Sequence, residues 1–178
     1  MDVIELVIAD HDEAADLFEQ LERLAADDAR SNQAMRLVHQ LAVSIKTHAK
    51  AEERILTDVM RSASPELAQL AREGPYEHQA LDVMLDKLVL HRPGPELVAI
   101  LHVARRLFVQ HARDEEEAVV LPALRTAVDP EERARLAHDF LVEKKRIRPG
   151  IERLVGAPAR ATGEARLRHL HVHLHHRR

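Results

Sequence analysis

The chain has 178 residues, of which 46% are hydrophobic and 31% charged, and its formal net charge is -4. This length suits one domain with its own core, and the slightly acidic balance argues against non-specific nucleic-acid binding. The sequence contains no cysteine, which excludes disulfides, iron–sulfur clusters and thiolate zinc sites within it.

The sequence also gives no sign of membrane association. Its longest apolar runs are far shorter than the roughly 20 residues that span a bilayer. The first residues include Asp2 and Glu5 and lack the basic segment that opens a signal peptide. We therefore expect a cytoplasmic protein that binds neither nucleic acid nor membranes.

Apolar residues recur in steps of three and four along the chain, which is the spacing of amphipathic helices and not of strands. In the first predicted helix this stripe consists of Ile4, Val7, His11, Ala14, Phe18, Leu21 and Ala25. After a polar turn over 27–32, a second helix is predicted from Ser31 to about Met60.

Prolines and glycines mark the later boundaries. They predict a short connecting helix over 65–72, a third helix from Tyr76 to His91, and a fourth from Pro95 until Pro122 kinks or ends it. A fifth helix is expected to start at 129–130, where Asp and Pro are typical cap and first-turn residues, and to end before Pro149.

These helices predict an all-α fold, an up-down-up-down four-helix bundle with a C-terminal fifth helix and tail. We expect the bundle over residues 1–126, a fifth helix over 127–155 that packs on the bundle or extends from it, and an Arg/His-rich tail over 156–178. The tail has five histidines between His169 and His176. It is interpreted as a metal-gathering segment, a solvated cationic tail or a sequence resembling a purification handle.

Each predicted bundle helix carries one histidine on its buried stripe, and an acid follows three of them by four positions, on the same helix face. The histidines are His11, His48, His78 and His111, and the acids are Glu52, Asp82 and Glu115.

Two of these acids, Glu52 and Glu115, fall at stripe positions where an ionised carboxylate is costly unless it is paired or bound to metal. No lysine or arginine lies on those stripes, so a metal ion is the simplest explanation. The neighbouring acids Glu53, Glu116 and Glu117 are predicted to point away into solvent.

The order His11, His48-x-x-x-Glu52, His78, His111-x-x-x-Glu115 resembles the hemerythrin-like HHE cation-binding domains. The segments HAKAEERIL and HARDEEEAVVLPAL are similar to that family's second and fourth helices, and the resemblance covers roughly 2–126. It implies two non-heme iron ions, oxo- or hydroxo-bridged, inside the bundle. By this resemblance His11 and His48 hold one iron, His78 and His111 hold the other, and Glu52 and Glu115 bridge both.

The third predicted helix departs from the oxygen-carrying members of that family. By the resemblance, those members have a His-x-x-x-His pair on this helix. In this sequence the residue four positions after His78 is Asp82. Asp82 is interpreted as a further metal ligand, as an acceptor for the ring of His78, or as a solvated acid.

The resemblance implies a protein that binds O2 or a related small ligand, for sensing, storage or scavenging of O2, NO, peroxide or iron. The alternative is a di-iron enzyme that activates O2 or decomposes peroxide, as an oxygenase, oxidase or catalase-like protein. A purely structural helical module is a third hypothesis. A substrate-sized cavity beside the metals would favour catalysis, and a site walled by Phe18, Ile55, Leu81 and Phe108 would favour a small gas. The sequence identifies no protein partner.

Overall fold

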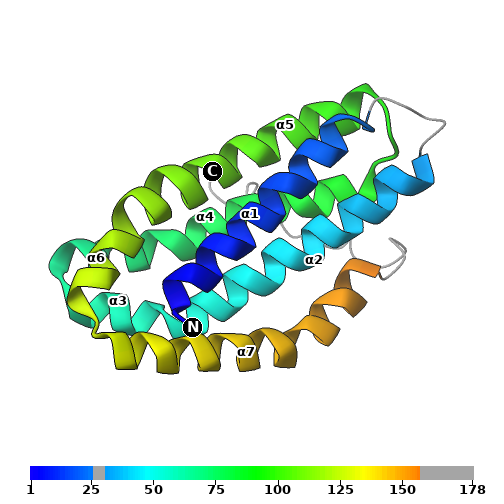
Figure 1. Ribbon diagram of the computed structural model, residues 1–178. Helices are drawn as coiled ribbons and strands as arrows, with labels where there is room; N and C mark the ends of the chain where they lie inside the picture. Colours follow the sequence, from blue (N-terminus) through cyan, green and yellow to red (C-terminus); the bar gives the residue numbers. More distant parts are fainter. Residues whose placement is uncertain (26–30, 157–178) are drawn as a thin grey trace, which may run out of the picture.

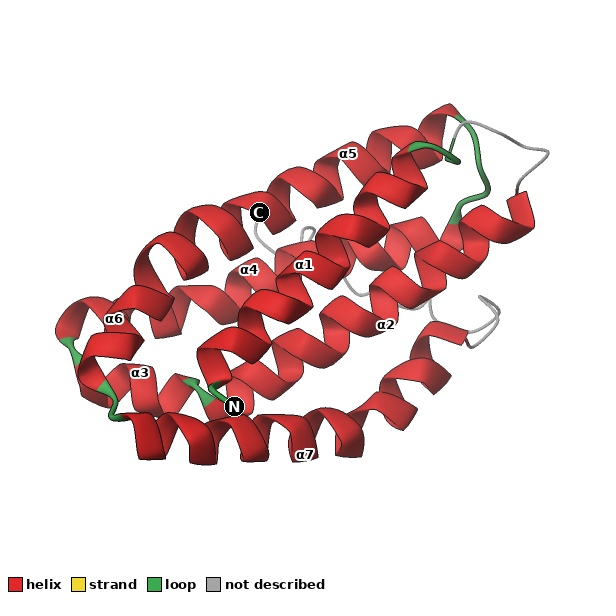
Figure 2. Ribbon diagram, viewed as in Figure 1, coloured by secondary structure: helices red, strands yellow, loops and turns green. Residues whose placement is uncertain are grey.

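The structure, a computed structural model, describes residues 1–25 and 31–156. Over these two ranges the chain is helical and has no strand (Figure 2), which confirms the all-α prediction. In chain order the elements are α1 (Val3–Glu22), α2 (Ser31–Ile55), α3 (Thr57–Ala63), α4 (Pro65–Leu90), α5 (Pro95–Val109), the π-helix η2 (Gln110–Val120), α6 (Leu121–Ala127) and α7 (Pro130–Gly156). The hypotheses for the histidine-rich tail fall outside the described residues.

The long helices pack on one another as a bundle (Figure 1). The helix α2 contacts both α1 and α4, and α5 contacts α1 and α4. The fifth predicted helix, α7, lies along α2 and also contacts α1 (Figure 1). These contacts agree with a helical bundle, while the up-down-up-down order and the domain limits stay predictions.

The buried apolar residues form two clusters with a polar layer between them. On α1, for example, Val7 belongs to one cluster and Ala14 to the other, and the buried His11 lies between them. The same change occurs on α2 between Ile45 and Ala51, where His48 lies. The four stripe histidines therefore occupy the middle of the bundle, where water is excluded.

Side-chain caps fix several helix starts. The carboxylate of Asp2 accepts a hydrogen bond from the backbone N–H of Ile4 at 3.0 Å, and Asp129 accepts one from Glu132 at 2.9 Å. The second contact confirms the predicted start of α7. Between α4 and α5, Gly94 has a φ of 149° and donates its N–H to the carbonyl of Ala25, a backbone conformation that favours glycine.

Two predicted helix boundaries at prolines were wrong. Pro75 lies inside α4, so the connecting helix and the third helix are one element, and Pro149 lies inside α7, which continues to Gly156. A proline inside a helix removes one backbone hydrogen bond but does not forbid helical φ. Packing on both sides of Pro75 outweighs that loss, since Ala71 and His78 are both buried.

The remaining boundaries differ in smaller ways. The predicted second helix is divided at Leu56 into α2 and α3. The predicted fourth helix includes the π-helix η2, and Pro122 lies in the first turn of α6, where its missing N–H costs little. None of the helices in the described ranges is both long and apolar enough to cross a membrane.

The docking of α7 on the bundle gives the first testable prediction. Phe140 is 0% exposed, whereas the next residue, Leu141, is 41% exposed. We expect Phe140→Ala to lower the free energy of unfolding by about 3–5 kcal/mol, because it leaves a cavity under α7. Leu141→Ala should change it by less than about 0.5 kcal/mol. Denaturant unfolding of both variants tests this, and equal effects would contradict the observed packing of α7.

Candidate metal centre

The four stripe histidines meet in the polar layer, one from each of α1, α2, α4 and η2. Their exposed fractions lie between 2% and 8%. This convergence agrees with the buried helix stripes predicted from the sequence, and the candidate metal groups include all four histidines: His11, His48, His78 and His111.

A carboxylate contacts the Nδ1 atom of every one of these imidazoles. The four contacts are His11 with Glu117 at 2.9 Å, His48 with Asp10 at 2.9 Å, His78 with Glu53 at 3.1 Å, and His111 with Glu77 at 2.7 Å. A carboxylate at this position accepts a hydrogen bond from Nδ1, so that Nε2 is the nitrogen that binds a metal once the ring is neutral. The arrangement therefore directs four Nε2 atoms toward the centre.

Two further carboxylates, Glu52 and Glu116, reach the centre from α2 and η2. The Oε2 atom of Glu52 lies 3.5 Å from Nε2 of both His48 and His78. The Oε2 atom of Glu116 lies 2.9 Å from Nε2 of His11 and 3.5 Å from Nε2 of His111. Each carboxylate thus stands between one histidine of the first pair and one of the second.

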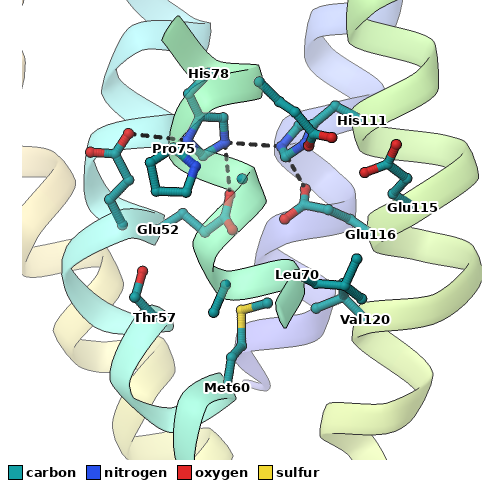
Figure 3. Close-up of a pocket in the computed structure, with 14 residues that line it drawn as sticks. Glu52, Thr57, Met60, Leu70, Pro75, His78, His111, Glu115, Glu116 and Val120 are labelled. Atoms are coloured by element: carbon teal, nitrogen blue, oxygen red, sulfur yellow. Dashed lines mark hydrogen bonds and ion pairs between the residues drawn. The ribbon is translucent and has the colours of Figure 1, made fainter. Parts of the chain in front are cut away.

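These ligand atoms form two compact groups that could each hold an ion. One is His11, His48 and Glu116, and the other is Glu52, His78 and His111, with the ligand atoms of each group within 4.8 Å of one another. Figure 3 shows the second group with Glu116 beside it.

The hydrogen bonding of these groups fits metal binding. Four atoms of the centre are buried without a hydrogen-bond partner: Nε2 of His11 and His48, and Oε2 of Glu52 and Glu116. Buried polar atoms are rarely left unpaired, because an unsatisfied group costs about 1–3 kcal/mol. Two nitrogens and two carboxylate oxygens left in this way are the donor set that a transition-metal ion requires.

The acid of η2 that turns inward is Glu116, so the expectation of a buried Glu115 was wrong, and so was the solvated Glu116. Glu116 is only 4% exposed and its carboxylate lies near His111 (Figure 3), while Glu115 is half-buried. The reason is the π-helix, whose i→i+5 hydrogen bonds align residues five apart and not four. Glu115 stays a candidate in a third, peripheral group with Glu77 and His111.

The expectation that Glu53 and Glu117 are solvated was also wrong, because both hold an imidazole. Asp10 and Glu77 were not singled out at all. A signal was present: each of these four acids is the immediate sequence neighbour of a group that faces the centre. Successive helix residues differ by about 100° in direction, so such a neighbour points sideways to the next helix.

The structure places Asp82 away from the centre. Its Oδ1 lies 3.0 Å from Nζ of Lys46, and its side chain is 38% exposed. None of the candidate metal groups among the described residues includes Asp82. Of its three interpretations, the contacts favour a partly solvated acid that pairs with Lys46.

The protonation of the centre depends on the same contacts. Burial alone would lower the pKa of His48 and of His78, but neighbouring carboxylates outweigh it and raise these values to about 9 and about 10. Burial and the nearby His48 lower the pKa of His11 to about 4. Burial and the charge of Glu52 raise the pKa of Glu116 to about 8.

Two small cavities, each of about 20 Å³, border the centre. The first opens beside Gly74, Glu77 and Glu115. The second is largely apolar and is lined by Leu81 and Phe108, as expected, but not by Phe18 or Ile55. The ring of Phe18 instead packs against that of Phe108, with centroids 5.3 Å apart.

A larger groove, of about 290 Å³, reaches His78 from its Glu53 side, between α2 and α4. Its lining includes Lys46 and Lys50, and His78 is the one lining residue that faces the centre. The space next to the converging Nε2 atoms is therefore large enough for water or a diatomic molecule but too small for an organic substrate.

The register of η2 can be tested by exchanging its two adjacent acids. We expect Glu116→Gln to retain at most one Fe²⁺ per chain after anaerobic loading, since Glu116 is a member of one three-residue group and its Oε2 lies 3.5 Å from Nε2 of His111 in the other. Glu115→Gln, the matched control, should retain as many ions as the unmodified chain. Metal analysis after gel filtration measures both. Loss of metal in Glu115→Gln alone would contradict the inward position of Glu116.

Metal loading should also release protons. At pH 7 the raised pKa values keep His48, His78 and Glu116 protonated, and a metal ion must displace protons from its ligands. The apparent affinity is therefore expected to rise from pH 6 to pH 8. Calorimetric titration with Zn²⁺ in two buffers of different ionisation enthalpy measures the release. Equal heats in both buffers would contradict protonated ligands in the metal-free protein.

Comparison with known proteins agrees with this geometry. The family model of the hemerythrin HHE cation-binding domain matches residues 2–124, from α1 into α6. No curated protein and no solved structure matches the chain. The matched segment covers more than half of the chain and includes all six groups that converge on the centre, so the chain belongs to the hemerythrin HHE cation-binding domain family.

Proposed function

We propose that the chain binds two non-heme iron ions in the polar layer and, through them, O2 or a related small ligand. One ion would be held by His11 and His48, the other by His78 and His111. Glu52 and Glu116 would contact both ions, because each carboxylate lies between histidines of the two pairs. The pairing of the histidines follows the two compact groups of ligand atoms.

The donor chemistry supports iron. Imidazole nitrogens with carboxylate oxygens suit iron, and the centre has no thiolate that would favour zinc or copper(I). The two inward carboxylates offset only half of the charge of two Fe²⁺ ions. The remaining positive charge in a dry site favours an electron-rich or anionic ligand.

The size of the cavities is the observation that carries the small-ligand proposal. The apolar cavity beside all four histidines has a volume of about 20 Å³, close to what one water molecule needs. Leu81, Phe108 and Ala112 exclude bulk water from it. A cavity of this size favours a ligand as small as O2, NO or peroxide over an organic substrate.

The residues of the chain position the metals and control access to them. Glu117, Asp10, Glu53 and Glu77 hold the rings at Nδ1, so that the Nε2 atoms keep one direction. When bound, a pair of Fe²⁺ ions supplies the electrons and the open coordination position that O2 binding requires. Sensing, storage or scavenging of O2, NO, peroxide or iron would all use this arrangement.

Anaerobic iron loading followed by ligand titration tests the proposal. We expect two iron ions per chain, and charge-transfer absorption in the near ultraviolet after exposure to air. Before that exposure, NO or O2 added to the anaerobic protein should change the spectrum with a stoichiometry of one per iron pair. Steady turnover of added peroxide, instead of such a titration, would favour the di-iron enzyme.

A double variant separates the proposed ligands from histidine-rich surfaces. His48→Ala together with Glu52→Ala should abolish iron loading. The first change removes a ligand from one group and the second removes a ligand from the other. His102→Ala is the matched control, since His102 is exposed on α5. Two irons per chain in the double variant would show that the ligand assignment is wrong.

A further inference from the structure

The helix α7 reaches the metal centre although it follows the segment that matches the family. Lys144 on α7 donates from Nζ to both carboxylate oxygens of Asp10, at 2.5 Å each. Asp10 in turn contacts Nδ1 of His48. The ring of Phe140, one helical turn before Lys144, stands edge-on to His48 with centroids 5.8 Å apart. Two residues of α7 therefore fix one proposed metal ligand.

The cations behind the other carboxylates come from the matched segment. Arg113 contacts Glu117 at 2.6 Å from the same π-helix, and Lys50 contacts Glu53 at 2.6 Å from the same helix α2. Glu77 contacts no lysine or arginine among the described residues. Asp10 differs from all of these, because its cation lies 134 positions away in sequence.

The contact of Lys144 is more constrained than an ordinary surface ion pair. The side chains of Asp10 and Lys144 are 13% and 22% exposed, and the ammonium also lies 5.5 Å from the centroid of Phe140. Charge-assisted bonds to both oxygens fix the carboxylate plane. Without them, Asp10 would keep only His48 as a partner and could rotate toward solvent.

We propose that Lys144 is a positioning residue of the metal centre, which holds His48 in its metal-binding orientation through Asp10. This inference rests on the proposed function. It makes the two ions inequivalent: the ion at His11 and His48 depends on α7, whereas the ion at His78 and His111 does not. The additional helix of this chain is thus part of the site and not only a cover for the bundle.

The test is a stepwise titration of the full chain with Co²⁺, whose visible absorption reports on each site. Lys144→Met is expected to lower the binding affinity for one of the two ions about tenfold and to leave the affinity for the other unchanged. A loss of this size is typical when the group that orients a metal ligand is removed. Lys144→Arg should restore the unmodified isotherm, because it returns a cation to Asp10. Lys145→Met, at the exposed neighbouring position, should have no effect.

A second measurement needs no metal. The Nδ1–H proton of His48 should lose its downfield NMR shift in Lys144→Met and regain it in Lys144→Arg. Lys144→Gln, which keeps the length and a donor but no charge, replaces the methionine variant if that one does not fold. An unchanged isotherm, or an unchanged His48 proton, would overturn the role of Lys144.

The two proposals fail in different ways. If the unmodified chain bound no metal, the proposed function would be wrong, and the His48 proton would still decide whether Lys144 positions that ring. If the unmodified chain bound two ions and Lys144→Met weakened both equally, the proposed function would stand. The specific link between α7 and one ion would then be wrong.

Discussion

The structure depends on a closed ring of carboxylate–imidazole contacts that links four helices. Each helix holds the histidine of the next one: Asp10 of α1 holds His48 of α2, Glu53 of α2 holds His78 of α4, Glu77 of α4 holds His111 of η2, and Glu117 of η2 holds His11 of α1. Rotation of any one helix would break two contacts of this ring. The ring therefore fixes both the helix faces and the direction of the four Nε2 atoms.

This ring has a cost that the two apolar clusters must offset. A buried polar layer stabilises a fold only if its groups are satisfied, and four inward atoms here have no hydrogen-bond partner. The apolar clusters on either side hold the helices together despite this deficit. The layer is thus preorganised to bind cations, which gain the contacts that the protein atoms lack. The unpaired atoms that would bind metal lower the stability of the metal-free chain. Bound ions would raise the stability of the loaded chain, because they bind the folded state.

Helical periodicity is sufficient to predict the all-α fold and the convergence of four histidines, because both follow from which face of each helix is apolar. Counted from His111, this period does not predict the inward acid of η2, because the backbone there hydrogen-bonds five residues ahead. Counted from the buried residues Ala112, Val120 and Leu124, steps of four do reach position 116. The continuity of α4 through Pro75 also depends on tertiary packing, which no local rule contains.

The four carboxylate–imidazole contacts, the corners of the ring, have different charged neighbours, so the surroundings of the centre are asymmetric. The pair His11 and His48 is backed by the cations Arg113 and Lys144, through Glu117 and Asp10. On the other side His111 is backed by Glu77 and, next to it, a second acid, Glu115. Burial and the charge of Glu77 raise the pKa of Glu115, so this corner gains stability from any added positive charge. The His78 corner has a cation, because Lys50 contacts Glu53, so within the described ranges only the His111 corner has acids without a lysine or arginine beside them. This difference places the two proposed ions in different fields, although their ligand sets are alike.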